Sequence, residues 1–186
     1  DQRSTWALRQ TLIRVGYNAV DWSLGLNHGD VPGLLAKMLD VVRNLNLEKP
    51  IHLVGWSLGG YLAREVARDL PDSIAGVVTL GSPVIGGPKY TSVAKYWRTS
   101  AAVLDEIETT VAARYSVPIR CPVVSIYSKR DGIVQWRASI DTRSPNVRNI
   151  PIESSHLALG FSGRVIELVV RLVADNIVAN QLRTST

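Results

Sequence analysis

The sequence predicts an α/β fold: a mostly parallel sheet with helices on both of its faces. Short apolar runs alternate with longer amphipathic segments along the 186 residues, and that order is typical of parallel sheets. Valine and isoleucine fill these runs without regular polar alternation, as expected of strands buried on both faces. Hydrophobic residues make up 46% and charged residues 20% of the chain, which argues against disorder and indicates one globular domain over residues 1–186.

The first part of the chain predicts two helices and a strand. Residues 5–15 carry apolar side chains at helical spacing, and Gly16 stands where a helix favours glycine at its end. Residues 17–22 are expected to form a short strand. After a polar loop, Asp30 occupies a helix N-cap position, and apolar residues then recur at helical spacing as far as residue 45.

Further strands are expected in four apolar runs, at residues 51–54, 74–80, 122–127 and 147–152. Helices are expected between the first two of these runs, at 61–70, and in the tail from residue 157 to about 178. Residues 86–118 interrupt the alternation as a long insertion. It has no strand pattern, and its apolar residues suggest one or two helices.

A glycine-rich turn carries the strongest chemical signal. Residues 55–60 read Gly-Trp-Ser-Leu-Gly-Gly between an apolar strand and an amphipathic helix, the context in which a Gly-x-Ser-x-Gly turn presents a nucleophilic serine. Small residues two before and two after Ser57 would let the strand and the helix approach closely. The backbone N–H of Leu58, at the helix start, would stabilise an oxyanion. The alternative is a tight turn in which Ser57 merely caps the helix.

A serine hydroxyl needs a base that takes its proton, and the chain offers three histidines. His28 lies in a polar loop. His52 lies inside the strand before the turn, where it is expected to be a satisfied core or interface histidine. His156 follows an expected strand, at the sheet edge from which a base would reach the serine. His156 is therefore the predicted base, with a surface-loop histidine as the alternative.

The acid that orients the base is predicted to be Asp131. It follows the expected strand at 122–127, so it also lies in a loop at the carboxyl end of a strand. Asp105 belongs to the insertion and Asp141 to a later turn or helical segment, which makes both weaker candidates. For Asp131 the alternative is an ordinary turn aspartate before a glycine.

These motifs resemble those of the α/β-hydrolase family, in its lipase and esterase branch. The resemblance covers nearly the whole chain and rests on residues 53–60, 79–83, 127–134 and 154–157. It implies an α/β-hydrolase fold with a small helical cap, residues 86–118, over the pocket. It also implies that Trp56, Ser82 and Pro83 lie at the substrate site. Trp56 stands where lipases often have histidine, which breaks no chemical requirement.

The same family has a strand and a loop before the first helix of this chain, and that loop donates the second oxyanion N–H. Because the chain begins at Asp1, we expect it to be amino-terminally incomplete, with the second donor upstream of residue 1. In the family's sheet, the additional strand lies between the segments at 17–22 and 51–54. Without it, these two segments would face a gap or pair directly.

The expected activity is hydrolysis of a carboxylic ester through an acyl-enzyme intermediate, with a small-molecule or lipid-like ester as substrate. Acyl transfer by the same three residues, or a non-catalytic binding domain of the same fold, are the alternatives. No metal and no cofactor are expected. Cys121 is expected to be a buried apolar side chain.

Charge and hydropathy narrow the range of partners. The net charge is +5, but the lysines and arginines are scattered singly, so nucleic-acid binding is not expected. No apolar run is long enough to span a membrane, whereas peripheral membrane contact stays open. We expect a soluble protein and favour the cytoplasm as its location.

Overall fold

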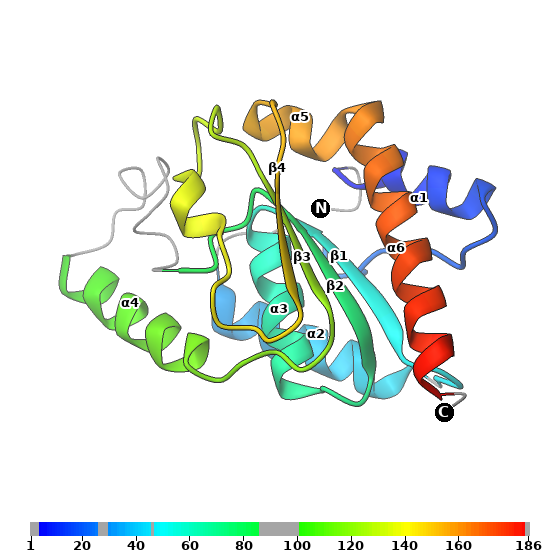
Figure 1. Ribbon diagram of the computed structural model, residues 1–186. Helices are drawn as coiled ribbons and strands as arrows, with labels where there is room; N and C mark the ends of the chain where they lie inside the picture. The colour runs from blue at the N-terminus through cyan, green and yellow to red at the C-terminus, as the bar shows by residue number, and fades with distance from the viewer. Residues whose placement is uncertain (1–3, 26–29, 46, 86–100, 185–186) are drawn as a thin grey trace.

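The computed structural model describes residues 4–25, 30–45, 47–85 and 101–184. Within this part, four strands form one sheet in chain order, and every neighbouring pair is parallel (Figure 1). The strands are β1 Ile51–Trp56, β2 Ile74–Leu80, β3 Val123–Tyr127 and β4 Val147–Pro151. Their carboxyl ends therefore meet at one edge of the sheet.

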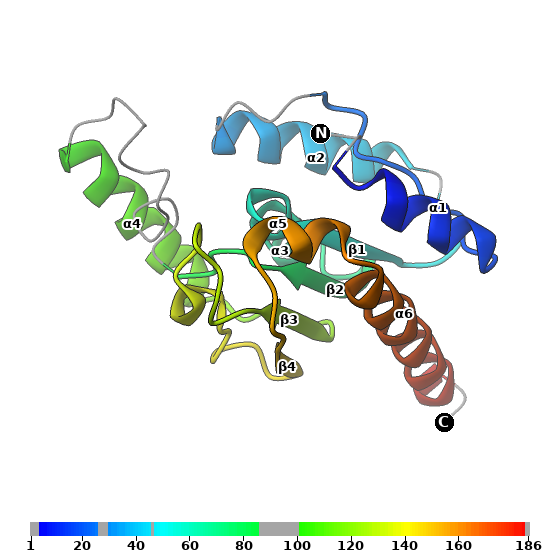
Figure 2. The same ribbon diagram turned by 90° about the horizontal axis from the view of Figure 1, so that it is seen from above.

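Helices cover both faces of this sheet, as the sequence predicts (Figure 2). The helices are α1 Trp6–Arg14, α2 Val31–Asn44, α3 Leu58–Asp69, α4 Ala101–Tyr115, α5 His156–Phe161 and α6 Gly163–Thr184. A 3₁₀ helix, η3 Trp136–Ser139, lies between β3 and β4. α2 and α3 pack on one face of the sheet, and α1 and α6 pack on the other. Among the helices described, none is both long and apolar enough to cross a membrane.

Alternate residues of the central strands belong to two separate hydrophobic cores. Val77 and Val123 pack with α2 and α3, whereas their neighbours Val78 and Val124 pack with α1 and α6. Because both faces are covered, β2 is buried at nearly every position. The sheet is thus a rigid base for the loops at its carboxyl edge.

The helix ends follow signals in the sequence. Asp30 caps α2, because its Oδ1 accepts a hydrogen bond from the backbone N–H of Gly33 at 3.1 Å. Gly16, just beyond α1, has a φ of +97°, a conformation that favours glycine. The tail is helical as predicted, but it divides at Ser162 into α5 and α6. This division makes α5 a separate short helix that begins at His156.

The predicted strand at residues 17–22 is wrong, because these residues carry no strand pairing. A strand needs a hydrogen-bonded neighbour, and β1 pairs only with β2 in the described part of the chain. A cavity of about 760 Å³ lies between residues 18–22 and β1 and extends to the turn at Ser57. Residues 17–22 therefore face a gap instead of a partner strand.

Of the predicted insertion at residues 86–118, the structure describes α4 and the loop after it. The last turn of α4 is tied to α3 by Arg114, whose guanidinium pairs with Glu65 and, at 3.0 Å, with Asp69. Both partners lie in the second half of α3, away from the turn at its start. Residues 86–100 lie outside the described residues, so the cap over the pocket stays a prediction.

Candidate active site

Ser57 lies on a sharp turn between β1 and α3. Its backbone has φ +55° and ψ −127°, and a residue with a side chain pays about 1–3 kcal/mol for such a conformation. A Cβ atom on Gly55 would lie 2.4 Å from the Gly59 carbonyl oxygen, and one on Gly60 would lie 2.0 Å from Ser82 Oγ. Glycine at position 55 therefore permits the close approach of β1 to the first turn of α3, and glycine at position 60 permits the close approach of α3 to Ser82. At Gly59, which the sequence also implicated, a Cβ atom would meet no described atom within 4 Å.

The Ser57 hydroxyl points to a histidine and not to the helix end. Its Oγ lies 3.1 Å from His156 Nε2, and its side chain makes no capping hydrogen bond to the described residues of α3. A serine that merely capped the helix would instead accept a hydrogen bond from a backbone N–H in the first turn of α3. The backbone N–H of Leu58, the first residue of α3, has no acceptor one turn earlier in the helix. This donor is therefore available beside the hydroxyl.

His156 is held at the start of α5 from two directions. Ser155 caps the helix by accepting a hydrogen bond from the Ala158 N–H at 3.3 Å. The loop before His156 is attached to Ser128: the Ser154 N–H donates to the Ser128 hydroxyl at 3.2 Å, and that hydroxyl donates to the Ser154 carbonyl. Only 6% of the His156 surface is exposed. The imidazole is thus fixed at the sheet edge.

Asp131 lies on the other side of the imidazole. Its Oδ2 is 2.7 Å from His156 Nδ1. Because a carboxylate oxygen only accepts hydrogen bonds, this contact places the ring proton on Nδ1 and leaves Nε2 as the acceptor that faces Ser57. The other oxygen, Oδ1, accepts the backbone N–H groups of Ile133 and Val134, both at 2.8 Å. The carboxylate is therefore oriented by its own loop.

Two residues that the sequence analysis did not select shape the contact between Asp131 and His156. Gly81, just after β2, has a φ of +53°, and a Cβ atom there would lie 2.9 Å from Asp131 Oδ2 and 3.3 Å from His156 Nδ1. Ser128, buried after β3, accepts from the Arg130 N–H and so joins the loop of Asp131 to that of His156. A glycine directly after a strand was an available signal for Gly81. Ser128 carried no comparable signal.

The residues predicted to bind substrate lie beside the turn, and two of them are buried. Ser82 is fully buried, and its hydroxyl donates to the Leu80 carbonyl at 3.4 Å. Pro83 is buried as well. Trp56 is half-buried, lines the cavity beside β1 and contacts the His156 ring. Substrate binding by these residues stays a prediction, and the burial of Ser82 and Pro83 favours support of the turn over contact with a ligand.

His52 takes no part in the contact among Ser57, His156 and Asp131. It lines the cavity beside β1, and its Nε2 has no hydrogen-bond partner among the described residues. The prediction of a satisfied core histidine is therefore wrong for Nε2, because the described residues at this edge of the sheet offer it no partner, whereas an interface histidine stays a prediction. Burial lowers the pKa of His52 below the ordinary 6.5, so its ring is neutral at pH 7. His28 lies outside the described residues.

Cys121 is buried, as predicted. Burial raises the pKa of its thiol to about 11, so the side chain is protonated at neutral pH and is a poor nucleophile. In the described ranges, no three side chains of the metal-binding types come together in a group that could hold an ion.

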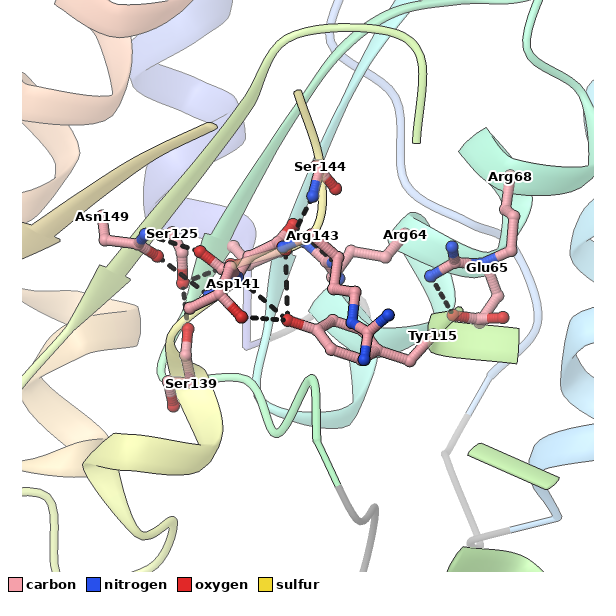
Figure 3. Close-up of polar contacts among 12 residues, drawn as sticks. Arg64, Glu65, Arg68, Tyr115, Ser125, Ser139, Asp141, Arg143, Ser144 and Asn149 are labelled. Atoms are coloured by element: carbon pink, nitrogen blue, oxygen red, sulfur yellow. Dashed lines mark hydrogen bonds and ion pairs between the residues drawn. The ribbon is translucent and has the colours of Figure 1, made fainter. Parts of the chain in front are cut away.

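A second aspartate, Asp141, lies in a separate polar cluster (Figure 3). Its Oδ2 is 2.9 Å from the Arg64 guanidinium, and neither side chain is more than 1% exposed. Its Oδ1 accepts the N–H groups of Arg143 and Ser144, at 2.8 and 3.1 Å. Tyr115, at the end of α4, donates to the same oxygen at 3.3 Å. Burial by itself would raise the pKa of Asp141, but the Arg64 charge and the hydrogen bonds lower it to about 2.

Comparison with known proteins agrees with this architecture. A family model described as the alpha/beta hydrolase fold matches residues 33–96. The structure of alpha/beta hydrolase domain-containing protein 10 from mouse matches with a TM-score of 0.64 and 19% identity, over 94% of this chain and 83% of that chain. The chain has the α/β-hydrolase fold. A thermophilic esterase from Thermogutta terrifontis shares this fold, with a TM-score of 0.60 and 16% identity over 95% of this chain and 86% of its own.

A curated relative is the bovine protein named palmitoyl-protein thioesterase ABHD10, mitochondrial. It is 26% identical over 159 residues, covering 72% of this chain and 51% of the relative. The chain therefore spans about half the length of that protein. The cytoplasmic location favoured by the sequence stays a prediction, since this relative is mitochondrial.

Proposed function

We propose that the protein is a serine hydrolase that cleaves carboxylic esters through an acyl-enzyme intermediate. The observation that carries the proposal is the continuous contact from Ser57 Oγ through His156 to Asp131, at 3.1 Å and 2.7 Å. A nucleophile, a base and an orienting acid, with the nucleophile on a strained strand-to-helix turn, favour this chemistry. The order serine, aspartate, histidine along the chain is that of α/β-hydrolases.

In the proposed first half-reaction, Ser57 Oγ attacks the ester carbonyl carbon while its proton passes to His156 Nε2. The Asp131 carboxylate holds Nδ1–H and stabilises the imidazolium. The carbonyl oxygen becomes an oxyanion, which the Leu58 N–H and the positive end of α3 stabilise. When the intermediate collapses, the bond to the leaving alcohol breaks, and Nε2–H returns the proton to the alcohol oxygen.

In the second half-reaction, a water molecule attacks the carbonyl carbon of the acyl-enzyme. His156 takes a proton from the water and gives it to Ser57 Oγ as the carboxylic acid leaves, so the protons balance over the cycle. An alcohol in place of water would transfer the acyl group by the same steps, which is the alternative activity. We assign the second oxyanion donor to none of the residues that the structure describes.

For the acyl group, we propose a lipid-like chain. The bovine relative is named a palmitoyl-protein thioesterase, and the similar structures include lipolytic enzymes and an esterase. A thioester differs from an ester in the leaving atom and calls for the same three residues, so both classes belong in the substrate test. Residues 86–118 are our candidate for a cap over the acyl group.

A panel of p-nitrophenyl esters and matching acyl thioesters, from acetyl to palmitoyl, tests this proposal on the full-length protein. We expect Ser57→Ala and His156→Gln each to lower kcat by at least about 10⁴. Ser23→Ala is the matched control, because Ser23 has the same φ of +55° in an exposed segment and bonds only its neighbour Asp21 in the described part. Turnover that survives Ser57→Ala would refute the proposal, and product analysis with mixed alcohols separates hydrolysis from transfer.

A further inference from the structure

Trp56 connects the turn that carries Ser57 to the backbone of His156. It is the last residue of β1, directly before the serine. Its indole Nε1–H donates a hydrogen bond to the main-chain carbonyl of His156 at 3.0 Å, across 100 positions of the sequence. The strand of the proposed nucleophile is thus bonded directly to the residue that is the proposed base.

The indole ring of Trp56 packs against α5. Its centroid lies 5.4 Å from that of the His156 ring and 5.5 Å from that of Phe161, which meets it edge-on. Gly160 passes directly over the ring, and a Cβ atom there would lie 2.9 Å from indole Cδ2. These contacts restrict the indole, so its N–H donor is held in one place.

The helix α5 depends on such an attachment because it is short. It has six residues, and a helix of that length has little stability of its own. Its cap at Ser155 is a single hydrogen bond in an exposed position. A displacement of about 1 Å in a catalytic group can lower a rate by about 10². The position of His156 therefore depends on what joins the first turn of α5 to the sheet.

We propose that Trp56 is a positioning residue for His156: its indole N–H fixes the main chain of the base and keeps Nε2 within reach of Ser57. The inference rests on the proposed function, because it gives Trp56 a role in the same reaction. The role differs from the substrate contact that the sequence suggested. Loss of one such hydrogen bond corresponds to a change of about 3- to 10-fold in rate.

The sharpest test replaces Trp56 by β-(3-benzothienyl)alanine in the full-length protein, since this side chain keeps the shape of the ring and carries sulfur in place of N–H. Trp56→Phe is the simpler variant. Trp6→Phe is the control, because Trp6 is 58% exposed on α1 and does not line the cavity that reaches Ser57. With a p-nitrophenyl ester, we expect kcat to fall about 3- to 10-fold in both Trp56 variants at unchanged KM, and no change in the control.

An NMR measurement makes the test independent of turnover. In the wild type, the His156 Nδ1 proton should give a downfield resonance, because Asp131 holds it. In the Trp56 variants, the resonance should broaden or disappear through faster exchange with water. If both variants keep this resonance and kcat, the inference is overturned. A raised KM at unchanged kcat also overturns it, because Trp56 is then a substrate contact. If the variants lose the resonance but even the wild type turns over no ester, the proposed function fails while the positioning role stands.

Discussion

Asp131 and Asp141 lie in the same connection between β3 and β4, and their local geometry is nearly the same. In each, Oδ1 accepts the backbone N–H groups two and three residues later. In each, Oδ2 meets a nitrogen from a distant part of the chain. For Asp131 that nitrogen belongs to His156, at 2.7 Å, and for Asp141 it belongs to Arg64, at 2.9 Å. The two carboxylates therefore differ mainly in their partners.

The partner decides what each aspartate is able to do. A guanidinium keeps its proton at every pH that a folded protein tolerates, so the Asp141 pair is a fixed link between α3 and the β3–β4 connection. An imidazole nitrogen is able to accept a proton and to return it, so the Asp131 pair is suited to a reaction, and its ring also reaches Ser57. One local motif thus supports the fold in one place and the proposed chemistry in the other.

The largest expected effect separates the two aspartates by activity. Asp131→Asn keeps an oxygen for its own loop, but it presents an N–H₂ group to His156 Nδ1 and favours the wrong tautomer. We expect kcat for the best ester to fall by about 10⁴, with little change in the urea midpoint of unfolding. Asp141→Asn, assayed where the protein is folded, should keep its kcat. Equal losses of kcat in the two variants would contradict the assignment of Asp131 to the reaction and of Asp141 to the fold.

The free energy of unfolding should show the opposite order, with the larger loss in Asp141→Asn and the smaller in Asp131→Asn. Asp141→Asn leaves the Arg64 charge buried without its anion, and breaking a buried pair costs about 3–5 kcal/mol. Urea unfolding should show a loss of this size, against less than about 1 kcal/mol for Asp131→Asn. Adding Arg64→Met to Asp141→Asn should recover part of the loss, because no charge then stays buried unpaired. If the losses of the single variants simply add, the ion pair is not their source.

Gly81→Ala sharpens the comparison because it disturbs the Asp131 pair and leaves the Asp141 pair alone, and its Cβ atom would also lie 2.8 Å from Leu159 Cδ1. The added Cβ atom would lie 2.9 Å from Asp131 Oδ2, at a φ of +53° that disfavours alanine. We expect steady-state assays to show kcat reduced by about 10². Gly132→Ala is the control in the loop of Asp131, since a Cβ atom there meets no described atom within 4 Å. If Gly132→Ala is as slow as Gly81→Ala, the loss of kcat comes from the loop and not from the contact between Asp131 and His156.

The smallest expected effect is a dependence of stability on acid pH at Asp141. Its pKa is lowered from 3.8 to about 2 in the folded protein, so the ionised group stabilises the fold above the unfolded pKa. That contribution, on the order of 2 kcal/mol, is lost as the pH falls from about 5 to about 2. The difference in unfolding free energy between wild type and Asp141→Asn should therefore shrink over this range in urea titrations. A constant difference would mean that Asp141 does not titrate with folding.

Much of the fold follows from local pattern. β2 has the predicted bounds, and the helices within residues 5–15 and 30–45 lie where apolar spacing, Gly16 and the cap at Asp30 place them. These signals depend on neighbours in the sequence. The strand expected at 17–22 fails because a strand also depends on a partner, and no pattern within the segment reveals whether a partner is present.

In the candidate site, too, some features could be predicted from the sequence, whereas those that depend on distant partners could not. The glycine-rich turn selected Ser57, elimination among three histidines selected His156, and the family resemblance contributed most to Asp131; the structure brings the three together. The choice of Asp131 over Asp141 could not rest on local geometry, since the two share it. The partners of Arg64 and Trp56 were not predicted, because they lie 77 and 100 positions away. A charged residue in an amphipathic helix is ordinarily assigned to the solvent side, which hid the buried pair.

The most direct test of the central claim is the position of a fluorophosphonate adduct on the full-length protein, mapped by mass spectrometry. We predict one adduct, on Ser57, formed by the wild type and by Asp141→Asn, much more slowly by Asp131→Asn, and not by Ser57→Ala. An adduct on a different serine, or labelling as fast in Asp131→Asn as in the wild type, would contradict the assignment of nucleophile and acid.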